Sequence, residues 1–210
     1  MRRALPIVVA VAMLAGCGGS KASKDPGGDA FRSLVRAAAA GDEATIRSLV
    51  TPASRVDVSA LRRRLRPFRS GYTVVVSERI TDAPPVGLVA AVHGGNAFGA
   101  ALRQVGKEWK FELGGPVRIR PLGPAPGARQ ARVRQLAAAI DGTKGAGGGE
   151  ALLYLDGLAA PDAKVYRFAK QLSIVSNLPT GVPKGRHSIV VFAAEGAHAA
   201  ARAWTFVVPG

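Results

Sequence analysis

The spacing of the apolar residues changes once along the chain, near Gly71, and this change restricts the fold more than any other feature. Before Gly71, apolar residues recur every three or four positions, which is the spacing of amphipathic helices. After it, runs of β-branched and aromatic residues alternate with glycine and proline turns, a pattern typical of strands. Helices followed by many strands predict an α+β fold with the helices gathered on one side of a sheet.

Three helices are predicted in residues 29–70. Asp29, Asp42 and Asp57 each precede a helical pattern, and an aspartate in this position can accept hydrogen bonds from the first free N–H groups of a helix. Gly41 separates the first two helices, and Pro67 bounds the third. We therefore expect a helix pair followed by one short helix.

Four strands are predicted between residues 72 and 113. The last of them, residues 108–113, alternates cleanly between large apolar and charged side chains. The third, residues 97–105, alternates only weakly. This meander would supply the sheet on which the three helices pack.

The order of elements in residues 29–117 resembles the NTF2-like fold, also called the cystatin-like cone, in which helices cover a curved antiparallel sheet. The matching parts are the helix pair at 31–50, the short third helix and the last strand, which ends Lys-Glu-Trp-Lys-Phe-Glu-Leu. The resemblance implies a cavity between helices and sheet. Tyr72 and His93 would be the candidate ligand-binding residues there, and Glu78 and Asp82 would be further polar candidates.

Residues 118–210 predict short strands with turn signals about every ten residues, as in β-sandwiches. The stretches Lys-Gly-Arg-His at 184–187 and Ala-Trp-Thr-Phe-Val at 203–207 resemble bacterial Ig-like or fibronectin-like modules. This resemblance implies an all-β Ig-like sandwich after the first domain, and a structural role for His187 in a turn.

The N-terminus has the layout of a secretory signal, with Arg2 and Arg3 before an apolar run of about 11 residues, which is too short to span a bilayer. The run ends in Leu14-Ala15-Gly16-Cys17, which resembles the lipobox of bacterial lipoproteins. The resemblance implies a signal peptide at 1–16 and a lipid on Cys17, the only cysteine. The glycine-rich residues 17–28 would form a flexible tether.

The formal net charge of +15 favours anionic partners. The predicted compartment is extracytoplasmic, which argues against nucleic acid as a partner. The expected partners are the membrane, which the protein would reach through lipidated Cys17, and either an anionic envelope polymer or an envelope protein. The densest cationic run is Arg62-Arg63-Arg64 with Arg66. Two interpretations of this run stay open, an ordinary solvated helix face and a dedicated anion site.

The sequence contains no Gly-x-Ser-x-Gly elbow, no phosphate loop and no two histidines at metal-ligand spacing. We therefore expect a non-enzymatic protein without a cofactor or metal, anchored by lipid to the outer face of the cell membrane, which displays binding modules. Two alternatives stay open: a carrier or sensor of a small apolar ligand in the cone, and an isomerase or dehydratase-like enzyme.

Overall fold

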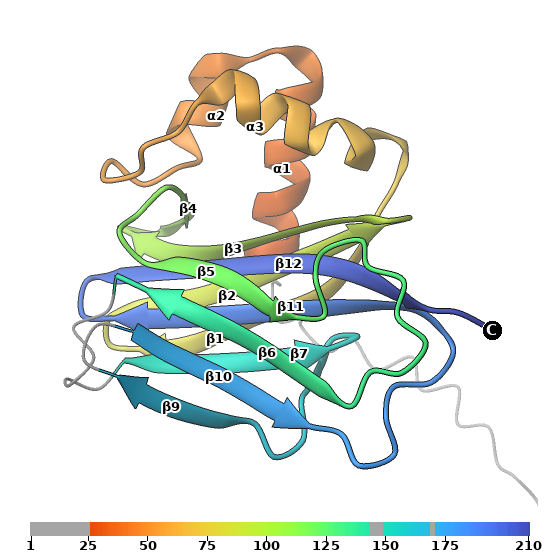
Figure 1. Ribbon diagram of the computed structural model, residues 1–210. Helices are drawn as coiled ribbons and strands as arrows, with labels where there is room; N and C mark the ends of the chain where they lie inside the picture. The colour runs from red at the N-terminus through yellow and green to blue at the C-terminus, as the bar shows by residue number, and fades with distance from the viewer. Residues whose placement is uncertain (1–25, 143–148, 169–170) are drawn as a thin grey trace, which may run out of the picture.

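The computed structural model describes residues 26–142, 149–168 and 171–210 (Figure 1). In this part of the chain, four helices come first: α1 (Pro26–Ala40), α2 (Glu43–Ser48), α3 (Val58–Leu65) and the 3-10 helix η1 (Arg66–Ser70). The predicted caps Asp42 and Asp57 are confirmed, since their carboxylates accept hydrogen bonds from backbone N–H groups. α1 begins before its predicted cap, so Asp29 and the last residues of the expected tether lie within it.

The described residues then form three four-stranded antiparallel sheets (Figure 1). Sheet A has the order β1 (Thr73–Asp82), β2 (Pro85–His93), β3 (Asn96–Val105), β4 (Glu108–Glu112). Sheet B has the order β5 (Arg118–Gly123), β6 (Gln135–Asp141), β10 (Gln171–Asn177), β9 (Lys164–Phe168). Sheet C has the order β12 (His198–Val208), β11 (Gly185–Glu195), β7 (Glu150–Leu155), β8 (Leu158–Ala159).

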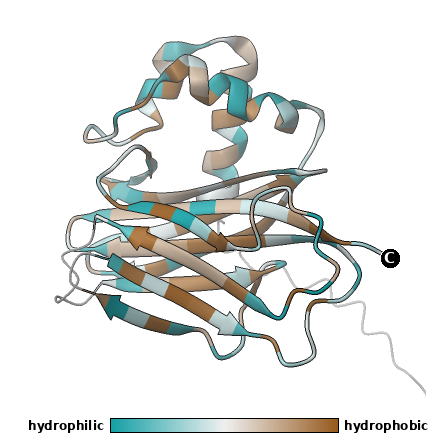
Figure 2. Cartoon of the chain, viewed as in Figure 1, coloured by the Kyte–Doolittle hydropathy of each residue, from teal (hydrophilic) through white to brown (hydrophobic). Residues whose placement is uncertain are grey.

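The helices and the three sheets stack in the order helices, sheet A, sheet C, sheet B, with an apolar core at each junction. Phe31, Leu34 and Leu65 of the helices pack on one face of sheet A. The other face of sheet A packs on sheet C, and the other face of sheet C packs on sheet B. Figure 2 shows hydrophobic segments along β6 and β10, two strands of sheet B.

The expected fold class, an α+β NTF2-like cone followed by an Ig-like sandwich, is wrong. Strands make up 52% of the structure and helices 19%, and the strands form three antiparallel sheets in one stack. The helices cover only one face of sheet A, and a second sheet covers the opposite face. Sheet A is therefore an inner layer and not the wall of a helix-packed cone.

The error has a physical cause that is visible in the strands themselves. A strand that is buried on both faces has no need of polar residues on alternate positions. In β2, six consecutive residues from Val86 to Ala91 are buried, and β3 has five, from Phe98 to Leu102. The weak alternation of β3 thus reflects the second sheet on its far side.

The junction between sheets A and C joins residues from both sides of the predicted boundary at 117/118. Val76, Leu88 and Ala101 of sheet A share one buried cluster with Val190 and Phe192 of sheet C. The two segments thus have a common core. None of the helices in the described residues is long and apolar enough to cross a bilayer.

Candidate functional site

Tyr72 and His93, the predicted ligand-binding residues, lie side by side at one end of sheet A. Thr73 pairs with Val92 across β1 and β2, which places the two residues next to each other. The half-buried Tyr72 ring packs with its centroid 4.9 Å from that of Phe31. The Nε2 atom of His93 lies 3.2 Å from the hydroxyl oxygen of Ser70.

The space between the helices and sheet A is occupied by aromatic side chains. Phe31, Phe68, Phe98 and Phe111 are at most 1% exposed and pack edge to face or tilted, with centroids 5.1 to 6.5 Å apart. These rings fill the position in which the resemblance had placed a ligand cavity.

The two further polar candidates are separated from that position. Glu78 is exposed and accepts a hydrogen bond from the hydroxyl of Tyr154 in sheet C. Asp82, also exposed, forms a 2.7 Å ion pair with Arg79. The structure therefore does not bring Glu78, Asp82 and His93 together around one buried point.

A cavity of about 660 Å³ lies elsewhere, where the edges of sheets A, B and C meet. Its wall includes β3, the end of β4, the start of β5 and the edge strand β12, and Arg64 reaches into it from α3. We call it the arginine cavity, because Arg64, Arg118 and Arg202 all line it.

Small residues create this cavity. A Cβ atom on Gly99 of β3 would lie 2.7 Å from the backbone nitrogen of Ala203 in β12, which is closer than atoms can approach, so only glycine allows the two strands to cross here. The other small residues of the two strands that line it are Ala97, Ala199, Ala200 and Ala201, and Gly95 lines it from the turn before β3. Because these side chains are so short, the crossing leaves room for a ligand.

Two of the arginines in the cavity wall, Arg64 and Arg202, carry charge that no carboxylate of the described residues neutralises. Arg64 is an exposed residue, although its guanidinium carbon lies 5.0 Å above the centre of the Phe98 ring. Desolvation by the surrounding protein, followed by the positive charge of Arg202, lowers the pKa of the Arg64 guanidinium. The Nη1 atom of Arg202 donates to the carbonyl oxygen of Ile119 at 3.0 Å. No ion pair within the described residues includes either arginine.

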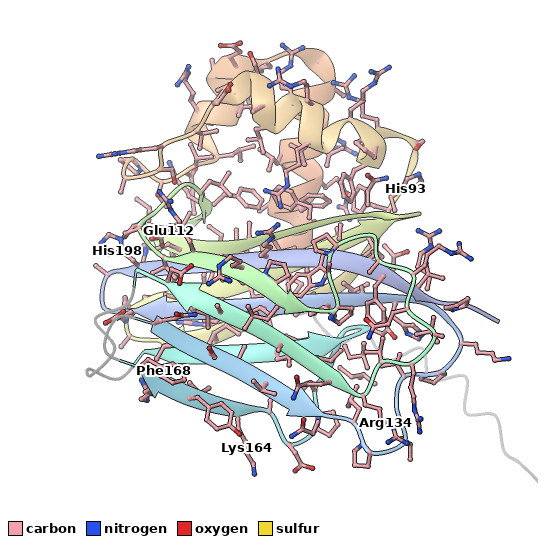
Figure 3. All side chains as sticks on the ribbon, viewed as in Figure 1. His93, Glu112, Arg134, Lys164, Phe168 and His198 are labelled. Carbon is pink, nitrogen blue, oxygen red and sulfur yellow. The ribbon has the colours of Figure 1, made fainter. Side chains whose placement is uncertain are left out.

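Glu112, the carboxylate in the cavity wall, already has a cationic partner, Arg103, and Figure 3 shows His198 close by. Its side chain is 6% exposed and lies 3.0 Å from Arg103 Nη2. Its Oε1 atom accepts a hydrogen bond of 3.1 Å from the backbone nitrogen of Ala199, and His198 Nδ1 is 3.6 Å away. Since Arg103 balances Glu112, the cavity keeps the positive charge of Arg64 and Arg202.

Most of this site could not have been found in the sequence. Arg64 belongs to the cationic run that had been considered as an anion site, but Arg202 lies 138 positions further along the chain. The cavity depends on a strand crossing between β3 and β12, and crossings between sheets leave no periodic signal. Glycine in the middle of β3 was the one local indication of close backbone approach.

The protein thus belongs to the class of helix-capped stacks of antiparallel sheets, and its main cavity among the described residues is cationic. No protein-family model matches the chain. No curated protein matches it either. Its function is therefore inferred from its own residues.

Proposed function

We propose that the protein is a non-enzymatic binding protein, anchored by lipid to the outer face of the cell membrane, that holds an anionic group in the arginine cavity. The observation that carries this proposal is the pair Arg64 and Arg202, which line one cavity and have no carboxylate partner in the described part of the chain. An anionic envelope polymer, or an acidic segment of an envelope protein, would supply such a group.

The electrostatics favour an anion between the two guanidinium groups. Two like charges that are close enough to lower a pKa repel each other, and partial desolvation strengthens that repulsion. A phosphate or carboxylate would replace repulsion with charge-assisted hydrogen bonds, which arginine can make with two parallel N–H groups. The cavity volume of about 660 Å³ falls within the range of small-molecule sites, roughly 300 to 1,000 Å³.

Titration with pyrophosphate, followed by calorimetry, tests the anion site. We expect the parent protein to bind, and Arg64→Gln and Arg202→Gln each to weaken binding about tenfold to hundredfold, since a hydrogen bond to a charged group contributes about 1.5–3 kcal/mol. Arg134→Gln is the matched control, because Arg134 is exposed and lies far from the cavity (Figure 3). Equal losses in all three variants would contradict the proposal.

The anchor is supported by the sequence Leu14-Ala15-Gly16-Cys17, which lies outside the described residues. A diacylglyceryl group with a further acyl chain holds a protein firmly at a membrane, whereas one acyl chain does not. We expect Cys17→Ala to move the protein from the membrane fraction to the soluble fraction, as measured by fractionation and blotting. Unchanged partitioning of the variant would show that Cys17 is not the anchor.

A further inference from the structure

Apart from Arg64, the cationic run of α3 and η1 lies outside the arginine cavity and forms a second site. Residues 58–70 contain five arginines and no acidic residue. Leu61, Leu65 and Phe68 are buried on the inner side of these helices. On another side, residues three or four positions apart line a separate pocket of about 280 Å³, which we call the arginine stripe: Ser59, Arg62, Arg63, Arg66 and Arg69.

The stripe has cationic groups without anionic partners. No ion pair within the described residues includes Arg62, Arg63, Arg66 or Arg69. The Nε atom of Arg62 is buried and has no hydrogen-bond partner in the described part of the chain. Buried polar atoms almost always have partners, so an orphaned donor beside a cationic pocket indicates a place for an acceptor atom.

We propose that the arginine stripe docks on anionic phospholipid and takes one phosphate headgroup into its pocket. The pocket is lined by four guanidinium groups and one serine, a set of donors that matches phosphate oxygens. Arg69 Nη2 donates to the carbonyl oxygen of Ala38 at 2.8 Å, which fixes one of these side chains against α1. The stripe thus combines one guanidinium group that a hydrogen bond fixes in place, that of Arg69, with the exposed guanidinium groups of Arg63 and Arg66.

The position of the stripe suits a planar surface. Figure 1 shows α3 at the end of the molecule opposite sheet B. Arg63, Arg66 and Arg69 are exposed there, and none of the large apolar side chains exposed in the described residues belongs to the helices. A surface that is cationic but not apolar binds at the headgroup level and does not insert.

Vesicle co-sedimentation tests this proposal in the chain that begins at Gly18, so that neither the N-terminal apolar run nor an acyl chain contributes. We expect binding to vesicles of mixed phosphatidylcholine and phosphatidylglycerol at about 0.1 M salt, and little binding to phosphatidylcholine alone. The pair Arg63→Gln and Arg66→Gln should weaken binding roughly 25-fold, because each arginine near an anionic surface contributes roughly fivefold. The matched control pair, Arg132→Gln and Arg134→Gln, should bind like the parent.

Arg62→Lys separates a headgroup site from a general charge effect, since it keeps the charge and removes the Nε–H group. We expect this variant to bind the mixed vesicles several-fold more weakly than the parent, with an unchanged thermal midpoint. Parent-like binding by Arg62→Lys, equal losses in the stripe and control pairs, or no loss in the stripe pair would each overturn the proposal.

Soluble glycerol phosphate distinguishes a membrane from a free phosphate ester. Because glycerol phosphate can compete only for the pocket, it should weaken vesicle binding only in part; complete displacement would show that the exposed arginines contribute nothing at the membrane surface, and membrane docking by the stripe would be wrong. The proposal requires neither the lipid anchor nor the arginine cavity. Arg64→Gln should therefore bind vesicles like the parent even if pyrophosphate binding in the cavity fails.

Discussion

At the scale of single residues, Asp156 fixes the geometry of sheet C. It occupies the turn between β7 and β8 with a φ of 52°, a region that aspartate and asparagine tolerate better than most residues. Its carboxylate accepts hydrogen bonds from the backbone nitrogen of Ser188 at 2.7 Å and from that residue's hydroxyl at 3.3 Å. The same carboxylate lies 2.7 Å from Nδ1 of His187, whose Nε2 lies 2.8 Å from the carbonyl oxygen of Pro183.

We expect Asp156→Asn to lower the free energy of unfolding by about 1–2 kcal/mol, because the amide keeps the turn conformation but loses the charge that strengthens these hydrogen bonds. Urea unfolding followed by circular dichroism measures the change. Asp162→Asn is the control, since Asp162 also has a positive φ, of 50°, and is exposed. A loss at position 162 as large as that at 156 would assign the effect to the turn and not to the carboxylate.

At the scale of elements, the crossing of β3 and β12 positions the arginine cavity. The backbones approach so closely that a side chain on Gly99 would meet the backbone of Arg202 and Ala203. The crossing also places Arg202 beside Arg64, although the two belong to different layers. The site therefore depends on a backbone contact and not only on the two arginines.

Gly99→Ala should destabilise the protein by about 1–3 kcal/mol, the usual cost of forcing extra volume into a packed core. It should also weaken pyrophosphate binding, because β12 must shift to make room. Gly123→Ala is a matched control, since nothing lies within 4 Å of a Cβ atom there. Thermal unfolding and calorimetry give both quantities, and a Gly99→Ala variant of parental stability would disprove the close crossing.

At the scale of the whole molecule, sheet C belongs to two cores at once. It packs on sheet A through residues such as Val190 and Phe192, and on sheet B through Ile189, Val191 and Trp204. Successive residues of β11 thus point to opposite faces of sheet C and pack into different cores. Removing either neighbour would expose one complete apolar face, which couples the stability of the layers.

This coupling predicts a single unfolding transition. The protein has two tryptophans, Trp109 in sheet A and Trp204 in sheet C. We expect the single-tryptophan variants Trp109→Phe and Trp204→Phe each to give one denaturant midpoint by fluorescence that coincides with the midpoint from circular dichroism of the same variant. Two well-separated midpoints would indicate independent domains and contradict a shared core.

Some of this architecture could be predicted from the sequence, and the reason differs between elements. Asp42 and Asp57 were predicted correctly because helix capping involves residues only three positions apart. The turn of the last hairpin, at Glu195-Gly196, is equally local, and Glu195 pairs with His198 across it. Local signals were sufficient for such elements.

The order of the layers could not be predicted in this way. The buried run in β2 is compatible with any neighbour on its second face, because an apolar surface does not specify the sheet that covers it. The arginine cavity was missed for a related reason, since Arg64 and Arg202 meet only after the layers have stacked. Tyr72 and His93 remain untested as ligand-binding residues, although the structure places them beside the aromatic core and away from this cavity.

Sheet C is covered on both faces, and this limits how the gene for such a chain can recombine. A gene fragment that encoded only residues 118–210 would produce a sheet whose apolar side, including Phe192, lacked its cover from sheet A. Exposed apolar sheets tend to aggregate. The two halves therefore cannot be shuffled between genes like separate modules, and recombination within this gene would be tolerated only where both halves travel together.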